Sequence, residues 1–237
     1  GQVPAWLNLV DNLDGTANLS GVPTNDEVGD HPITLTVTDL NGNGTSVATQ
    51  FTITVTNTND APQFGVYEPT IAENVGSGFI LVNINEQNTG NDTDIDGTQL
   101  EYTYIPGQEN PLFAINRLSG VLSLTDVGAA ALNYEHTQAY ELRFVVDDDF
   151  SSTLLTVTVN VTDVNEAPSI SNGTTSIAEN SLNGTTVTTI VGSDPDAGDT
   201  LSYAITGGSG SQLFDIDENT GIVTVNGLLD HENDVSH

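Results

Sequence analysis

The chain has 237 residues, no cysteine and no methionine, and 33 acidic residues against two basic ones, which gives a net charge of −31. Without cysteine, disulfides, thiol nucleophiles and zinc–thiolate sites are excluded. The charge argues against binding to nucleic acid or to an anionic membrane surface. It favours cations, calcium first, because carboxylate and carbonyl oxygens suit that ion. For acids outside the motifs below, a solvated surface that resists aggregation is an equally good interpretation.

Short runs in which apolar residues alternate with threonine occur at 33–37, 51–55 and 155–161. A period of two with one apolar face is typical of a strand in a β-sandwich. Clusters of Gly, Asn and Asp, at 41–44 and 88–94, supply turns between the runs. No convincing helical stripe is present. The pattern therefore predicts an all-β chain of immunoglobulin-like Greek-key sandwiches.

Two short words recur in the chain at the same spacing. The word Ala72-Glu73-Asn74 returns as Ala178-Glu179-Asn180, and the segment 57–62 returns as 163–168. Longer stretches repeat as well: 113–124 matches 214–225, 132–135 matches 229–232, and Asp94-Ile95-Asp96 matches Asp194-Pro195-Asp196. The agreement predicts tandem domains of roughly 100 residues each.

The repeated words are rich in oxygen ligands and lie at the predicted domain junctions. Carboxylates gathered there without lysine or arginine repel one another unless a metal ion offsets their charge. Calcium takes about six to eight oxygen ligands, more than any single loop of this chain offers. We therefore interpret the junctions as calcium sites whose ligands come from both sides of each linker.

With these repeats, the chain resembles the cadherin family, in which Glu-Asn, Leu-Asp-x-Glu, Asp-x-Asp and Asp-x-Asn-Asp words ligate calcium between successive domains. Residues 63–168 fit a complete cadherin-like domain, and residues 169–237 fit the N-terminal part of another. The segment 1–62, with Pro4-Ala5-Trp6-Leu7 and Leu19-Ser20-Gly21-Val22-Pro23-Thr24, is similar to the C-terminal half of a dystroglycan-type cadherin-like domain. The Asn-Glu-Ala-Pro linker looks like bacterial or environmental arrays.

The resemblance implies a set of calcium ligands at each junction. At the first junction the expected ligands are Glu27, with Asp26 beside it, and Asn59, Asp60, Glu73, Asp94, Asp96 and Asp148. At the second junction they are Asn133, Glu135, Asp163, Asn165, Glu166, Glu179, Asp194 and Asp196. Two positions depart from the family pattern, because Glu166 and Asn133 stand where the family usually has Asp. Each linker is also one residue shorter than the usual animal form.

These observations predict a calcium-dependent extracellular adhesion or stalk segment of a cell-surface protein, without enzymatic activity. The alternative is a carbohydrate-binding module of a secreted matrix or polysaccharide-associated protein. Such a module would expose two or three aromatic side chains on one face. The five tyrosines in or near the strand patterns are instead expected to be buried: Tyr67, Tyr102, Tyr104, Tyr134 and Tyr140.

The sequence shows no initiator methionine, signal peptide or apolar run of membrane-spanning length, so we expect it to be a piece of a longer chain that does not itself contact a membrane. The first segment lacks its opening strands and the last segment lacks its closing strands. Completion of these ends by neighbouring molecules in a head-to-tail filament is one hypothesis. Partial coverage of a longer chain is the other, and it is favoured.

Overall fold

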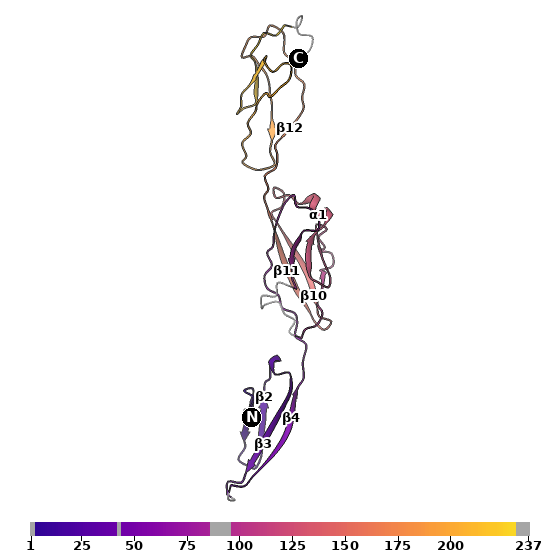
Figure 1. The fold of residues 1–237 in the computed structure, drawn as a ribbon, viewed down its shortest axis with the longest axis vertical. Helices are drawn as coiled ribbons and strands as arrows, with labels where there is room; N and C mark the ends of the chain where they lie inside the picture. The colour runs from indigo at the N-terminus through magenta and orange to yellow at the C-terminus, as the bar shows by residue number, and fades with distance from the viewer. Residues whose placement is uncertain (1–2, 42–43, 86–95, 231–237) are drawn as a thin grey trace. The chain divides into compact units, whose positions relative to one another are not determined.

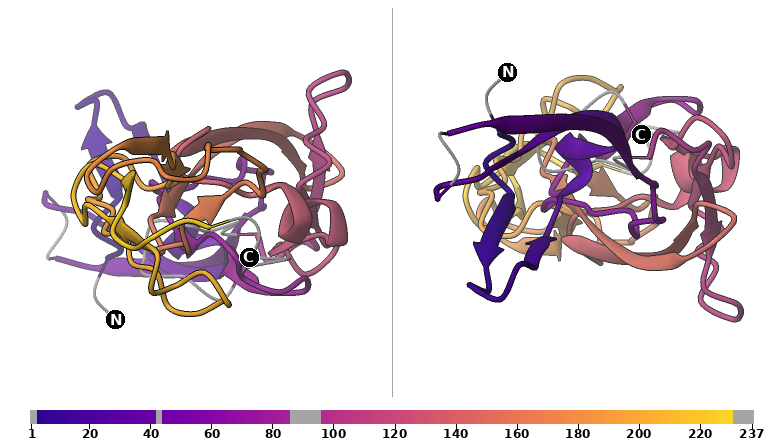
Figure 2. Two further views of the ribbon diagram at one scale, coloured as in Figure 1. Left: turned by 90° about the horizontal axis from the view of Figure 1, so that it is seen from above. Right: turned by 90° about the horizontal axis from the view of Figure 1, so that it is seen from below.

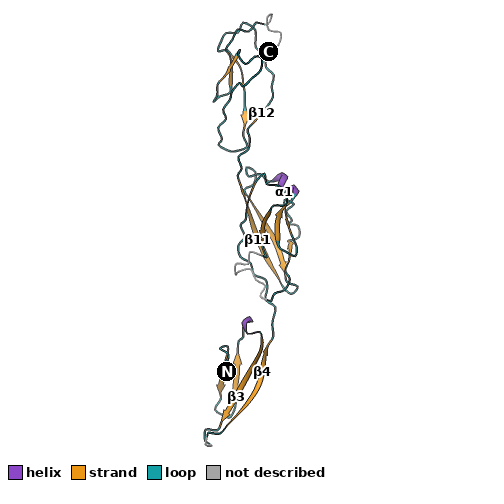
Figure 3. Cartoon of the chain, in the orientation of Figure 1, coloured by secondary structure: helices purple, strands orange, loops and turns teal. Residues whose placement is uncertain are grey.

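The structure is a computed structural model that describes residues 3–41, 44–85 and 96–230. This part of the chain consists of strands and loops with two short helical segments, as Figure 3 shows, and the all-β prediction is confirmed. The helical segments are η1 (Asn25–Glu27) and the alanine-rich α1 (Asp126–Ala131), which are too short to show as a stripe in the sequence. No helix within the described ranges is long and apolar enough to span a bilayer.

The chain divides into two compact units, which are described separately. The first comprises Gly1–Pro69, Ser77–Gly128 and Glu141–Val159, and the second comprises Thr70–Gly76, Ala129–Tyr140 and Asn160–His237. Two long strands, β10 (Ala139–Asp147) and β11 (Ser152–Thr162), run through both units. The domain boundaries expected at residues 62 and 168 stay a prediction.

The first unit begins with two hairpins. Strands β1 (Leu7–Asp11) and β2 (Ala17–Gly21) pair antiparallel. Strands β3 (Gly29–Thr38) and β4 (Ser46–Val55) pair along their full length, from Gly29 opposite Val55 to Thr38 opposite Ser46. The predicted strands 33–37 and 51–55 lie within this long ribbon, which Figures 1 and 2 show. Its two strands form a sheet of their own.

The rest of the first unit contains a three-stranded sheet and part of a four-stranded one. The three-stranded sheet has the order β6-β9-β8, with β6 (Ile80–Asn83), β8 (Phe113–Ile115) and β9 (Val121–Leu124). Strand β7 (Glu101–Tyr104) pairs antiparallel with β10 in a sheet of order β5-β11-β10-β7. The core of the unit includes Phe144 and Tyr102, both essentially inaccessible to solvent.

One glycine is required for this packing. Gly120 has a φ of 66°, which disfavours any residue with a Cβ atom. A Cβ atom there would also lie 3.0 Å from the ring of Tyr102. Gly120 thus allows the turn before β9 to close over a buried tyrosine, and Gly221, with a φ of 68°, occupies the corresponding turn before β16.

In the second unit, β5 (Thr70–Ala72) pairs in parallel with the end of β11, with Asn160 opposite Thr70, Val161 opposite Ile71 and Thr162 opposite Ala72. The remaining strands are β12 (Ser169–Ile170), β13 (Thr186–Thr189), β14 (Gly192–Ser193), β15 (Phe214–Ile216) and β16 (Ile222–Val225). They form the sheets β12-β14 and β13-β16-β15. The register shift in β13 repeats the one in β6, so the internal repeat extends to irregularities of the sheet.

Replacing Phe144 tests the core of the first unit. Phe144 is fully buried, and its ring lies 4.6 Å from that of Tyr104 between centroids. Phe144→Ala should lower the free energy of unfolding by about 3–5 kcal/mol, because it removes a large buried side chain and leaves a cavity. Phe150→Ala, at a position that is 77% exposed, is the matched control and should cost less than about 0.5 kcal/mol in urea unfolding.

Tyr104 should make stability fall at alkaline pH. Burial raises its pKa from 10.0 to about 12, since the fold disfavours the phenolate, and its hydroxyl donates to the carbonyl oxygen of Phe113 at 3.2 Å. The stabilising contribution is therefore complete below pH 10 and is lost as the pH rises through about 12. Urea unfolding at a series of pH values should show that Tyr104→Phe lacks this part of the loss of stability at alkaline pH. An identical pH profile for both proteins would contradict the assignment.

Candidate metal centres

The first cluster consists of Asn57, Asn59, Asp60, Asp96 and Asp148, all in the first unit. Oδ2 of Asp96 accepts a hydrogen bond from the backbone N–H of Asp60 at 2.6 Å, and its Oδ1 accepts one from Asn57 at 2.8 Å. The amide of Asn59 donates to Oδ2 of Asp148 at 3.0 Å. Asp96 and Asp148, which are far from the segment 57–60 in the sequence, thus lie next to it. Three carboxylates and two amides come together there.

The side chain of Asp148 is fully buried. Burial raises its pKa, but hydrogen bonds from the Asn59 side chain, from Ser151 and from the backbone of Phe150 outweigh this effect and lower the pKa to about 2. Ser151 donates both its N–H and its hydroxyl. The turn after β10 thus holds a preformed carboxylate next to the linker.

Glu27 makes hydrogen bonds that the sequence did not predict. Its carboxylate accepts hydrogen bonds from the backbone and hydroxyl of Thr24 and so caps η1, which lowers the pKa of Glu27. Asn25, from the same turn, donates to the carboxylate of Asp60. Asn25 and Asn57 are additional residues of this region. Asn57 could have been found from its place in the repeated linker word, whereas Asn25 carries no such signal. The expected ligand Asp94 lies outside the described residues.

The second cluster consists of Glu73, Glu135, Asp163, Glu166 and Asp196, all in the second unit. Carboxylate oxygens of Glu73, Glu135 and Asp163 lie within 4.8 Å of one another, and so do those of Glu135, Glu166 and Asp196. Glu135 belongs to both groups. The five acids therefore form one continuous array of oxygen ligands around the linker that leaves β11.

Glu73 is the most firmly held member of the second cluster. Its side chain is only 2% exposed, and its two oxygens accept hydrogen bonds from the N–H groups of Val164, at 2.9 Å, and Tyr134, at 2.8 Å. The sequence interpretation placed Glu73 at the first junction, and the structure corrects this. Because β5 runs parallel to the last residues of β11, the residue after β5 lies beside the outgoing linker.

The two linkers make corresponding contacts with the Asp-x-Asp words. The N–H of Glu166 donates to Oδ2 of Asp196 at 2.8 Å, just as the N–H of Asp60 donates to Asp96. The amide of Asn165 donates to the carbonyl oxygen of Glu166, the counterpart of the contact between Asn59 and Asp60. The repeated words therefore encode repeated geometry.

The second cluster has an excess of negative charge. Partial desolvation raises the pKa of Asp163, and the charges of Asp196 and Glu73 raise it further. At Glu135 a backbone hydrogen bond lowers the pKa, but desolvation and the charges of neighbouring acids, Glu73 first among them, outweigh it and the pKa is raised. The sequence contains only two basic residues, and both form ion pairs elsewhere: Arg117 with Glu101 and Arg143 with Glu141.

Two oxygens of the second cluster are suited to a cation. Oε2 of Glu166 and Oδ1 of Asp196 are buried and have no hydrogen-bond partner. A buried polar oxygen without a partner is costly, and a hard metal ion would satisfy it. The residues present therefore fit a calcium ion by chemistry as well as by charge.

A third group, which overlaps the second cluster, contains Asp194, Asp196 and Asp199, again within 4.8 Å. The N–H of Asp196 donates to Asp194 at 3.1 Å. Asp199 was not predicted, because in the sequence it looks like a residue of a Gly-rich turn.

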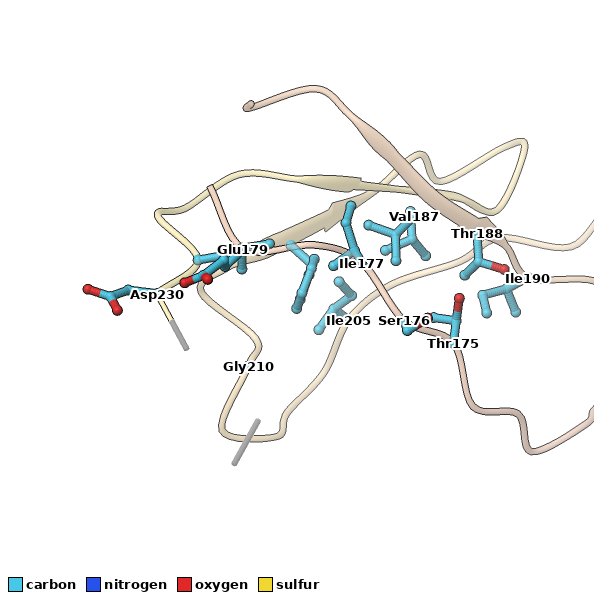
Figure 4. Close-up of a pocket in the computed structure, with 13 residues that line it drawn as sticks. Thr175, Ser176, Ile177, Glu179, Val187, Thr188, Ile190, Ile205, Gly210 and Asp230 are labelled. Carbon is cyan, nitrogen blue, oxygen red and sulfur yellow. The ribbon is translucent and has the colours of Figure 1, made fainter. Parts of the chain in front are cut away.

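Two expected ligands of the second junction are not members of the second cluster. Glu179 is exposed and borders a groove together with Asp230, as Figure 4 shows, and it is in none of the acidic groups among the described residues. Oδ1 of Asn133 accepts a hydrogen bond from the N–H of His136 at 2.8 Å, so Asn133 shapes the turn that carries Glu135.

Comparisons with known proteins identify the family to which the chain belongs. A family model described as the cadherin domain matches residues 174–237. The chain is 32% identical over 215 residues to protocadherin Fat 4 of Homo sapiens, an alignment that covers 86% of this chain and 4% of that protein. It is 33% identical over 178 residues to cadherin-23 of Mus musculus, covering 70% of this chain and 5% of that protein. The chain thus spans a small fraction of the length of these relatives.

The fold is similar to that of solved cadherin structures. The crystal structure of repeats EC22–24 of mouse cadherin-23 matches with a TM-score of 0.64 and 24% sequence identity, over 97% of this chain and 74% of that chain. Cadherin extracellular domains are immunoglobulin-like β-sandwiches, so the predicted fold class is confirmed. The chain is composed of tandem cadherin-like repeats of the extracellular adhesion type, and its relatives are extracellular or cell-surface proteins.

Neutralising Glu73 tests the electrostatics of the second cluster. In metal-free protein, Glu73→Gln should lower the pKa values of Glu135 and Asp163, because a neighbouring negative charge is removed from both. An NMR titration of the side-chain carboxyl signals measures the change. Glu109→Gln, at an exposed acid outside the acidic groups, is the control and should leave both pKa values in place. Unchanged values in Glu73→Gln would show that the charges do not interact.

Proposed function

We propose that this chain is a calcium-dependent adhesion or stalk segment, in which calcium ions bound at the two clusters stiffen the linkers between successive repeats. The observation that carries the proposal is the second cluster. It gathers five acids with raised pKa values at Asp163 and Glu135, holds two buried oxygens without a partner, and contains no basic residue.

The type of ligand supports calcium over other metals. The donors available in both clusters are carboxylate, amide and carbonyl oxygens, and neither cluster includes histidine. The chain contains no cysteine at all. Soft or borderline metals such as zinc and copper prefer nitrogen and sulfur donors, whereas calcium prefers oxygen. Cadherin domains typically bind calcium, which is consistent with this donor set.

The chain's own residues prepare the second site. The N–H groups of Val164 and Tyr134 fix the carboxylate of Glu73, and Asp196 accepts the N–H of Glu166 and so holds the linker against the Asp-x-Asp word. Calcium would supply the positive charge that offsets the repulsion among these acids. Residues 163–166 would then be tied to both the preceding and the following repeat, and their freedom to hinge would be reduced.

The same reasoning extends to the first cluster, where Asp60, Asp96 and Asp148 would provide carboxylate ligands and Asn59 an amide oxygen. With dissociation constants of about 0.1–1 mM, typical of extracellular modules, 10 mM calcium would stabilise the fold by roughly 1.4–2.7 kcal/mol for each ion bound. Extracellular fluid would load such sites, and cytosol would not.

Three finer parts of the proposal rest on the sequence. We propose that residues 1–62 form part of a dystroglycan-type cadherin-like domain, that residues 63–168 form a complete repeat and 169–237 part of the next, and that the parent is a bacterial or environmental surface protein. The words at 4–7 and 19–24 support the first part, and the spacing of the repeated words supports the second. The Asn-Glu-Ala-Pro linker supports the third.

The carbohydrate-binding alternative receives no support from the tyrosines. Tyr67 and Tyr102 are buried, and Tyr104, Tyr134 and Tyr140 are half-buried. None of these five is an exposed residue, whereas the aromatic side chains on which a sugar stacks are expected to be exposed.

Calorimetry with Asp196→Asn tests the calcium proposal. The wild-type chain should bind several calcium ions and melt at a higher temperature with calcium than with chelator. Asp196→Asn should bind fewer ions and show a smaller melting shift, because Asp196 belongs both to the group with Glu135 and Glu166 and to the group with Asp194 and Asp199. The variant Glu109→Gln removes one negative charge outside the clusters and should behave as wild type. Absence of calcium binding by the wild-type chain, or equal binding by Asp196→Asn, would overturn the proposal.

A further inference from the structure

Two linker segments of the chain have corresponding sequences, the first linker (residues 57–60) and the second linker (residues 163–166). In each of them, the N–H of the last residue donates a hydrogen bond to Oδ2 of an aspartate in the Asp-x-Asp word, Asp96 for the first linker and Asp196 for the second. Each contact lies within one compact unit and away from the ends of the chain. The surroundings of the two aspartates can therefore be compared directly.

The two aspartates differ in the partner of their other carboxylate oxygen. Oδ1 of Asp96 accepts a hydrogen bond from the side-chain amide of Asn57 at 2.8 Å. Oδ1 of Asp196 is buried and has no hydrogen-bond partner. Because the donor to Asp96 comes from the first linker itself, the lack of such a donor at Asp196 is a property of the second linker.

One position of the repeated linker word accounts for this difference. Asn57 is the first residue of the first linker, and Asp163 is its counterpart in the second. An asparagine amide carries two N–H donors, whereas an ionised aspartate can only accept hydrogen bonds. Asp163 therefore cannot give Asp196 the contact that Asn57 gives Asp96.

Asp163 also brings a negative charge to the place where Asn57 is neutral. Desolvation raises the pKa of Asp163, and the charge of Asp196 raises it further, so the two carboxylates repel each other. A buried carboxylate oxygen in such surroundings is costly unless a donor or a cation reaches it. At Asp96 the amide of Asn57 already serves as that donor, through a hydrogen bond to a charged group.

We propose that the residue at this position sets how far each linker depends on a bound cation: Asn57 holds the first linker on Asp96 without metal, and Asp163 makes the second linker depend on calcium to stay on Asp196. The part that concerns Asp163 rests on the proposed function, because it assigns calcium to the second cluster. One linker would then stay docked in chelator while the other is released. As calcium falls, the second linker would become a hinge before the first.

Hydrogen exchange of two backbone N–H groups, measured by NMR, tests this difference. The N–H groups of Asp60 and Glu166 are the linker donors to Asp96 and Asp196, so their exchange reports whether each linker is docked. In chelator, the N–H of Asp60 should be protected at least about tenfold more than the N–H of Glu166, because Asn57 stabilises the docked first linker. With excess calcium, both N–H groups should be protected.

Reciprocal substitutions test the position itself. In chelator, Asn57→Asp should lower the protection of the Asp60 N–H by about tenfold, because a donor is replaced by an acceptor of like charge. Asn57→Ala should also lower it, because the donor is lost without any added charge. Asp163→Asn should raise the protection of the Glu166 N–H in chelator, because the new amide can donate to Oδ1 of Asp196.

The matched controls are Asn219→Asp and Asp215→Asn. They make the same changes of charge at exposed positions outside both linkers and outside the acidic groups among the described residues. Both controls should leave the exchange of the two linker N–H groups as it is in the wild-type chain. A change as large as that of the linker variants would mean that net charge, and not the donor at residue 57, holds the first linker.

Three results would overturn the proposal: equal protection of the two N–H groups in chelator, full protection of the Asp60 N–H in Asn57→Ala, or unchanged exchange of the Glu166 N–H in Asp163→Asn. Failure of the proposed function has a different signature. A wild-type chain that binds no calcium in calorimetry would overturn the calcium proposal and with it the role of Asp163. The exchange rates in chelator would still decide whether Asn57 holds the first linker.

Discussion

The parallel pairing of β5 with the last three residues of β11 is the contact on which the second acidic cluster depends. It brings the residue after β5 to the linker, where Glu73 is buried and held by two backbone N–H groups. A buried carboxylate of this kind is tolerable only because those donors satisfy it. Carboxylate oxygens of Glu135 and Asp163 lie within 4.8 Å of those of Glu73, and desolvation together with the charges of neighbouring acids raises the pKa of both residues.

Local sequence pattern predicted much of the fold but less of the ligand geometry. Alternation over 33–37, 51–55 and 155–161 correctly indicated β3, β4 and β11, because each of these strands has one apolar face. The cluster to which Glu73 belongs could not be read in this way, since a parallel pairing between residues that are distant in the sequence leaves no periodic signal. Asn25 and Asp199 were missed for a related reason: each sits in a turn whose composition shows only that a turn exists.

The two copies of the Ala-Glu-Asn word show how far environment controls a residue's role. Glu73 and Glu179 occupy the same place in the same word, yet the first is 2% exposed and the second is exposed. Asn74 and Asn180 keep the same left-handed backbone, with φ values of 61° and 59°, so the local turn is encoded by the word itself. Burial of the Glu73 carboxylate depends on the pairing of β5 with β11, which is not encoded by the word itself.

The pairing of Arg117 with Glu101 and of Arg143 with Glu141 has a consequence for cleavage of the chain by proteases. Trypsin-like proteases require a basic side chain in their specificity pocket, and this chain offers only these two. Arg143 lies within β10 and Arg117 lies between β8 and β9, so neither is on a long exposed loop of the kind that proteases prefer. A composition with so few basic residues thus makes the segment a poor substrate for digestion after basic residues.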